Sequence, residues 1–138
     1  MNLYYSIWTD CILRAKSQPQ NHNNWKGYTL LFMSMSMAIN LITLMAILQR
    51  NILHKSFYNI EFSISQSSKL NALISFIILF LLPPIILNYI LIFRNNRYKQ
   101  IIGKYKYYNG KLFAKYFLGS LILPFVLLLI GYIVEIYL

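Results

Sequence analysis

Acidic side chains are almost absent from this chain of 138 residues, which has Asp10, Glu61 and Glu135 against 13 lysines and arginines. The three carboxyl groups are scattered, so the sequence offers no pair for general acid–base catalysis. The two histidines, His22 and His54, fall on opposite sides of a membrane in the topology predicted below. We therefore expect a protein that is not an enzyme. A membrane enzyme with dispersed catalytic residues is the alternative.

Cysteine is also scarce, and the single Cys11 excludes an internal disulfide framework. No other cysteine or histidine stands near it at the spacing of a metal site. A phosphate-cradling glycine loop, an HExxH motif and a paired CxxC are missing as well. We expect neither a metal nor a cofactor.

Charge is low for a soluble protein, because charged residues make up 12% of the chain and hydrophobic residues 58%. Soluble domains carry about twice that charged share. Three apolar segments, residues 28–48, 70–93 and 112–138, are long enough to cross a bilayer, which takes about 20 residues of helix. We predict an all-α integral membrane protein with three transmembrane helices. Residues 1–27 are polar and mixed, so we expect no cleavable signal peptide.

Basic residues are distributed unevenly among the remaining segments. Three precede the first apolar segment, seven lie between the second and Tyr116, near which the lipid-spanning core of the third is expected to begin, and three lie in the 49–69 loop. The positive-inside rule then predicts a cytoplasmic N-terminus, a cytoplasmic 94–111 segment, and an external 49–69 loop and C-terminus. The abundance of Asn, Ile, Lys and Tyr favours an AT-rich bacterial genome, so the expected location is the bacterial inner membrane.

The segments outside the apolar runs have patterns of their own. In residues 1–27, apolar side chains at helical spacing predict an amphipathic helix at the membrane interface or docked on a partner, followed by a linker; these side chains are Tyr4, Trp8, Cys11, Ile12 and Ala15. In the external loop, residues 58–65 alternate between apolar and polar, which indicates either a half-buried strand or an irregular interfacial loop.

Residues 94–111 form the most basic segment. A helical stripe of apolar and tyrosine side chains predicts that the second span continues as a cytoplasmic helical extension, turns at Asn109-Gly110 and returns as the third span. Its cations are expected to contact anionic phospholipid headgroups. A protein partner is the second interpretation, and nucleic acid the least favoured. The cations concerned are Arg94, Arg97, Lys99, Lys104, Lys106 and Lys111.

Polar and small residues recur inside the spans. In the first span one face holds Thr29, Ser36, Asn40 and Thr43. In the third span one face holds Ser120, Pro124 and Gly131. Both patterns predict helix packing, and a path for an ion or solute is the alternative for the first.

Pro83 and Pro84 lie within the second apolar segment. Each lacks an N–H, so the carbonyl groups of residues 79 and 80 lose their helical partners. Asn40 and residue 79 are both about 3 to 4 Å to the outer side of the membrane midplane, so we predict that Asn40 donates to this backbone. Glu135 stands near the C-terminal end of its helix, where a cation should offset it. The candidates are Arg50, Lys55 and Lys69.

These patterns predict a small non-enzymatic membrane protein, as an accessory or structural subunit of a bacterial inner-membrane complex. Three helices alone offer little protein to cover the polar stripe and the proline pair, so we expect a membrane-protein partner or a homo-oligomer. An oligomeric pore or transporter module is one alternative, and a membrane immunity or defence protein is another.

Overall fold

A computed structural model describes residues 2–55 and 62–137 of the chain. This described part is helical, with no strand in it. Three of its helical stretches are long and apolar enough to cross a membrane, namely Trp25–Leu53, Ser68–Lys104 and Lys111–Ile136. The predicted all-α class and the three helices of spanning length and composition are therefore confirmed.

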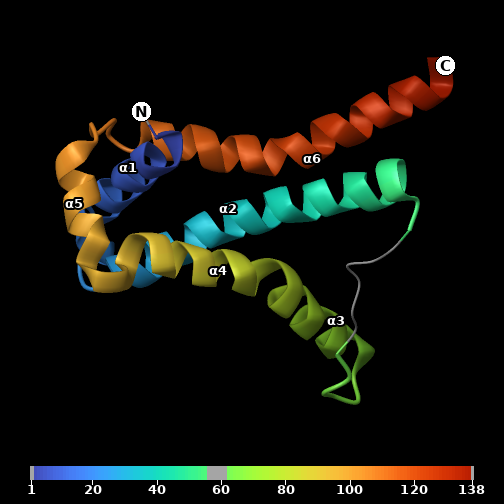
Figure 1. Cartoon of the computed structure of the whole chain (residues 1–138), viewed down its shortest axis with the longest axis horizontal. Coiled ribbons are helices and arrows are strands. Elements are labelled where there is room, and N and C mark those ends of the chain that lie inside the picture. The colour runs from blue at the N-terminus through green and yellow to red at the C-terminus, as the bar shows by residue number, and fades with distance from the viewer. Residues whose placement is uncertain (1, 56–61, 138) are drawn as a thin grey trace.

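The first long helix is α2, Trp25–Ile47, which passes into a π-helical turn at Leu48–Leu53 and ends at His54, whose φ is 51°. The third is α6, Lys111–Tyr137. Figure 1 shows α2 and α6 running alongside each other from the end that holds the N-terminus. Their apolar composition and length account for both helices, since helical hydrogen bonds satisfy the whole backbone of a spanning segment.

The second long helix is assembled from four pieces: α3 (Ser68–Phe76), a π-helical turn (Ile77–Leu81), α4 (Leu82–Asn88) and a second π-helical turn (Tyr89–Phe93). Pro83 and Pro84 stand in the first turn of α4, where a missing N–H is best tolerated. The backbone N–H of Leu82 bonds the carbonyl of Ile77, five residues back. The prolines thus coincide with a change of helical type, and α3 bends away from the line of α4 (Figure 1).

The sequence predicted that the second span continues directly into the basic segment. The structure instead has a break in the helix between them. Asn95 and Asn96 adopt left-handed conformations with φ of 56° and 55°, which asparagine tolerates better than most residues. This kink makes α5, Arg97–Lys104, a separate helix that runs across the end of the bundle (Figure 1). The predicted turn is present, since Asn109 and Gly110 both have positive φ immediately before α6.

The middle of the N-terminal helix α1, Leu3–Ser17, is enclosed by the rest of the chain, while Leu3 and the last turn of the helix are largely exposed. Every residue from Ser6 to Ile12 is buried, and α1 contacts α2, α5 and α6. The amphipathic pattern of the sequence predicted burial of the apolar face of α1 but not of its polar side. Its polar side, with Thr9 and Asp10, is buried as well because both side chains find hydrogen-bond partners.

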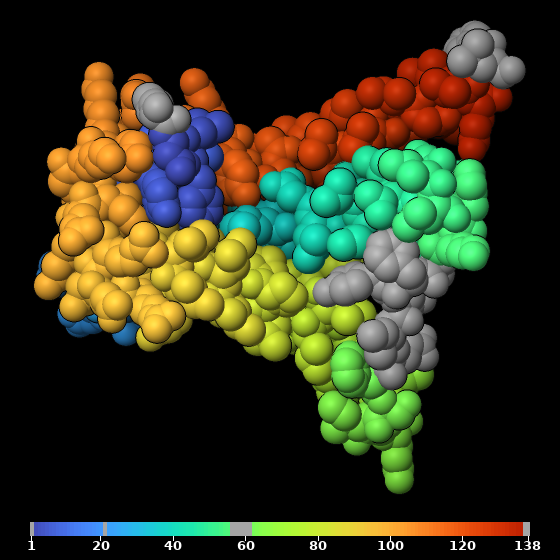
Figure 2. All heavy atoms as spheres, in the orientation of Figure 1, coloured from blue at the N-terminus to red at the C-terminus, as the bar shows by residue number. Residues whose placement is uncertain are grey.

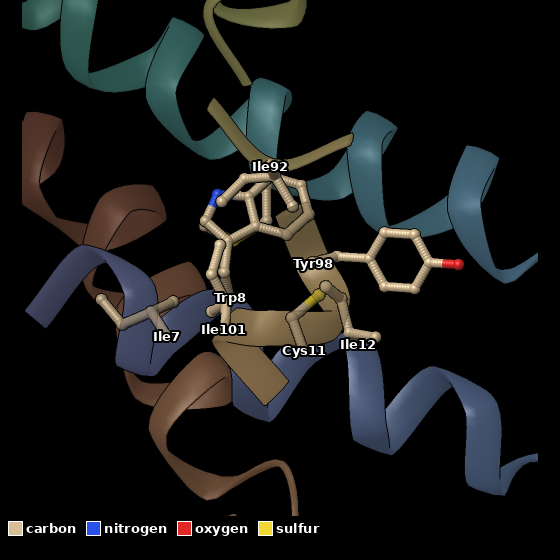
Figure 3. Close-up of a cluster of buried hydrophobic side chains, with 8 residues drawn as sticks. Ile7, Trp8, Cys11, Ile12, Ile92, Tyr98 and Ile101 are labelled. Atoms are coloured by element: carbon tan, nitrogen blue, oxygen red, sulfur yellow. The ribbon is translucent and has the colours of Figure 1, made fainter. Parts of the chain in front are cut away.

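The hydrophobic core lies at the same end of the bundle as α1 and α5. In Figure 3 the Trp8 ring lies beside Ile92. The same cluster includes Cys11 and Ile12 of α1 and Tyr98 of α5. Away from this end the helices diverge and carry exposed apolar side chains (Figures 1 and 2). The buried members of the core are Ile7, Trp8, Cys11, Ile12, Met33, Ile92, Tyr98 and Ile101.

The predicted strand at residues 58–65 lies partly outside the described residues, which resume at Phe62. From there to Ser65 the chain is irregular. The backbone N–H of Phe62 donates to Ser75 Oγ at 2.9 Å, and that of Ser65 donates to Asn71 Oδ1 at 2.8 Å. This part of the loop is therefore held by side chains of α3 rather than by a neighbouring strand.

Candidate functional site

The carboxylate of Asp10 joins α1 to the start of α6. Its side chain is fully buried, and Oδ1 accepts from the backbone N–H groups of Tyr108 at 2.8 Å and Gly110 at 3.0 Å. Oδ2 accepts from the N–H of Phe113 at 3.0 Å. A carboxylate at this place satisfies N–H groups that α6 cannot pair internally and faces the positive end of that helix. Asp10 is thus an N-terminal cap that comes from a different helix.

Gly110 makes this approach possible. Its φ of +80° disfavours other residues, and a Cβ atom there would lie 2.9 Å from Arg14 Cγ of α1. A side chain at position 110 would therefore collide with Arg14, so that Arg14 or α1 would have to shift. The positive φ and this close contact together favour glycine at the turn.

A second buried contact involves Asn88 of α4, whose side chain is fully buried. The Tyr4 hydroxyl donates to Asn88 Oδ1 at 2.6 Å, and Asn88 Nδ2 donates to Ser34 Oγ at 3.0 Å. This polar group connects α1, α4 and α2 through side chains alone. Burial raises the pKa of Tyr4 from 10.0 to about 12, so its hydroxyl keeps its proton for this bond.

A third polar contact joins α2 to α6. Asn40 Nδ2 lies 3.1 Å from Ser120 Oγ and 3.4 Å from the Tyr116 hydroxyl. The prediction that Asn40 donates to the backbone beside the prolines is wrong, because its amide points to α6 instead. The position of Asn40 along α2 does not determine which neighbouring helix its side chain faces.

The other members of the predicted stripe on α2 bond to their own helix. Thr29, Ser36 and Thr43 each donate to a backbone carbonyl four residues earlier, at 2.8 to 3.1 Å. Thr29 and Ser36 are 1% and 0% exposed. Bonding within the helix and the burial of Thr29 and Ser36 both fit helix packing.

On α6 the predicted face is used in part. Ser120 is buried and Pro124 is half-buried, but Gly131 is exposed, and a Cβ atom there would meet nothing within 4 Å. Farther along the same helix, Glu135 Oε1 lies 3.3 Å from Arg50 Nη2. Arg50 is one of the three cations expected to offset Glu135. Both side chains are mostly exposed, so in water the pair would contribute little.

The cations before the first span and those between the second and third all belong to the end capped by α1 and α5. The six predicted headgroup contacts are exposed. Some lysines lie over aromatic rings, with Lys16 Nζ 4.9 Å from the ring centre of Trp25 and Lys106 Nζ 5.6 Å from that of Tyr108. Such contacts hold an ammonium group near the ring without neutralising it.

The thiol at this site is that of Cys11, which is buried. Burial raises the pKa of the Cys11 thiol, which disfavours the reactive thiolate. The described residues contain no group of His, Cys, Asp or Glu that could hold a metal ion. Comparisons with protein-family models, curated proteins and solved structures find no match for the chain.

Sequence reasoning missed Asp10 and Asn88 as organising residues. Asn88 carried a usable signal, since an amide within an apolar run needs a protein partner. Asp10 carried a weaker one, an acid among the apolar residues of α1. No pattern in the sequence linked Asp10 to backbone groups that are about a hundred residues away.

Proposed function

We propose that this chain is a non-enzymatic accessory or structural subunit of a bacterial inner-membrane assembly, with its basic end in the cytoplasm. The observation that carries this proposal is the uneven packing of the three long helices. Their main buried cluster lies at the basic end, and only 6% of an 18-residue apolar stretch of α6 is buried. The outer part of the bundle therefore has far more apolar surface than the chain itself covers.

The exposed surface of α6 is suited to a second helix as well as to lipid. Phe125 and Leu128 are 73% and 66% exposed, and the open position of Gly131 lets another helix backbone approach closely. Ser120, the other small polar residue of this face, already contacts Asn40 of α2 within the chain. A partner helix packed at Gly131 would cover the part of the predicted packing face of α6 that the chain itself leaves exposed.

The cytoplasmic placement of the basic end rests on the distribution of lysine and arginine. A bacterial inner membrane has an anionic inner surface, and each lysine or arginine near such a surface contributes about 1 kcal/mol of attraction. An oligomeric pore is less well supported, because Thr29 and Ser36, which would line its path, are buried within the chain.

The test is extraction of the full chain in a mild detergent, followed by measurement of its native mass and identification of proteins that copurify. We expect a complex larger than the single chain. Replacement Gly131→Leu should reduce the copurifying protein, whereas Gly27→Leu should not. Gly27 is the matched control because it is also a helical glycine, at the opposite end of the bundle, where an added Cβ atom would meet nothing within 4 Å.

The opposing result is equally definite. A chain that copurifies with no other protein, assembles only with copies of itself, and conducts ions or solute in liposomes would contradict the subunit proposal and support the pore. A reporter that is active only in the cytoplasm, if active after Leu138, would overturn the orientation.

A further inference from the structure

The basic end carries a charge imbalance that the chain does not neutralise. Three cations precede the first span and seven lie between residue 93 and Tyr116. Within the described residues, the one carboxylate at this end belongs to Asp10, and both of its oxygens are bonded to backbone N–H groups in a buried place. Glu135 lies at the other end of α6 and pairs with Arg50. Anions from outside the chain must therefore balance these cations.

Two adjoining cavities show where such an anion would fit. One, of about 330 Å³, lies between the start of α1 and residues 104–108. The other, of about 170 Å³, lies between α1 and α5. Lys104 and Tyr105 line both. The larger cavity adds Lys106 and the hydroxyl-bearing Tyr108 and Ser6, while the smaller adds Arg97 and Tyr5.

Each cavity thus has the groups that bind a phosphate. Lys106 lines only the larger cavity, and Arg97 lines only the smaller one. Lys104 lines both, so each cavity has two cationic side chains. Tyrosine hydroxyls add hydrogen-bond donors. A guanidinium in particular matches the geometry of phosphate oxygens.

The level of these cavities relative to the second span favours a lipid over a soluble anion as the ligand. Tyr4 of α1 bonds Asn88, which lies five residues before Phe93, or about 7.5 Å into the second span by helical rise. The start of α1 is therefore level with the end of the span, where lipid headgroups lie. Tyrosines such as Tyr5 and Tyr105 are typical of that layer.

We propose that the two cavities form one binding site for an anionic lipid whose headgroup carries two phosphates, with one phosphate in each cavity and Lys104 between them. The proposal rests on the cytoplasmic, membrane-facing placement of the basic end given under the proposed function. It makes the basic end selective for a headgroup shape, where scattered surface lysines would respond to charge alone.

The test uses the full chain in mild detergent, with cardiolipin as the two-phosphate probe and phosphatidylglycerol as the one-phosphate probe, supplied at equal phosphate. Native mass spectrometry counts the lipids retained. We expect one cardiolipin per chain to be retained in preference to phosphatidylglycerol. Lys104→Gln should weaken that retention by about tenfold, since it removes a charge near both phosphates.

Lys99→Gln is the matched control, because Lys99 is an exposed lysine of the same helix that lines neither cavity. It should leave cardiolipin retention unchanged. Protection of Cys11 from a maleimide in each variant verifies that α1 remains in place, since that thiol is buried.

Three results would overturn the proposal. Equal losses in the two variants would mean that charge alone attracts the lipid. Equal retention of the two lipids would remove the selection for two phosphates. Displacement of cardiolipin by inorganic diphosphate at equal concentration would identify a soluble anion as the ligand. If the chain copurifies with a partner but does not prefer cardiolipin, only the lipid site is excluded. If the chain prefers cardiolipin but copurifies with no partner, only the subunit proposal is excluded.

Discussion

Replacement Asp10→Asn should open the basic end of the protein, because it removes the charge that holds α1 against α6. The asparagine oxygen can still accept from the backbone N–H groups of Tyr108 and Gly110. Its amide nitrogen, however, would face the N–H of Phe113, where Asp10 now presents Oδ2 at 3.0 Å. Two bonds are thus weakened and the third becomes a contact between two donors.

The energetic cost follows from these three contacts. Hydrogen bonds to a charged acceptor are worth about 1.5 to 3 kcal/mol each, and neutral ones about half as much. Two weakened bonds then cost about 2 kcal/mol together, and a buried N–H without a partner costs about 1 to 3 kcal/mol more. The total is about 3 to 5 kcal/mol. A change of 3 kcal/mol corresponds to about a hundredfold in the opening equilibrium.

Cys11 provides the assay without an engineered probe. It is the single cysteine of the chain, lies next to Asp10 in α1, and is 4% exposed. A maleimide can react only when α1 leaves its place, so the labelling rate follows the opening equilibrium if closing is fast. We expect Asp10→Asn to be labelled about a hundred times faster than the unaltered protein.

Thr9→Val is the control for this measurement. Thr9 is also fully buried in α1. Its hydroxyl donates to the Tyr5 carbonyl of the same helix at 2.9 Å and has only a longer contact, 3.4 Å, to the Ile101 carbonyl of α5. Its replacement should cost about 1 kcal/mol and raise labelling by less than about tenfold. If Asp10→Asn is labelled no faster than Thr9→Val, the carboxylate does not hold α1 in place and the reasoning fails.

Three further predictions concern the other polar contacts. Asn88→Leu and Tyr4→Phe should each lower the free energy of unfolding, and the double variant should cost less than their sum by about 0.5 to 3 kcal/mol; additive losses in detergent-induced unfolding would exclude the pairing. Because the pKa of Tyr4 is raised to about 12, its contribution to stability should be complete below pH 10 and lost as pH rises toward 12, and Tyr4→Phe should flatten that part of the pH profile. Glu135→Gln should change stability by less than about 1 kcal/mol, because the ion pair with Arg50 is largely exposed; a larger loss would mean that a partner or lipid buries the pair.

The helices of spanning length were predictable from composition because a membrane imposes a length and an apolar character on each segment. The sequence placed the first span at 28–48, and the helix in the structure extends from Trp25 to Leu53. The added residues at both ends are largely polar or aromatic, so apolar composition could not include them. The turn at Asn109-Gly110 was predictable for a local reason, namely the tolerance of these residues for positive φ.

Contacts between distant segments were not predictable in the same way. Backbone N–H groups of the 108–113 segment donate to the Asp10 carboxylate. Because nearly every residue has such a group, the residue types in that segment do not identify it as the partner of Asp10. The kink at Asn95 and Asn96 was missed for a different reason. The helical spacing that continues from Tyr98 to Tyr108 suggested an unbroken helix, whereas the two asparagines redirect the chain before that stripe begins.

The buried polar groups explain why α1 is part of the fold and why any moving part should lie elsewhere. Without α1, Asn88 would lose the Tyr4 hydroxyl, and the start of α6 would lose the Asp10 carboxylate. Buried polar groups without partners are costly, so displacement of α1 is opposed by several lost hydrogen bonds at once. At the other end of the bundle, Phe125 and Leu128 of α6 are exposed, and α3 bends away from the line of α4 (Figure 1). A partner helix could therefore dock along α6 near Gly131 without disturbing α1, and changes in helix angle on docking should occur at the π-helical turn Ile77–Leu81 before the prolines.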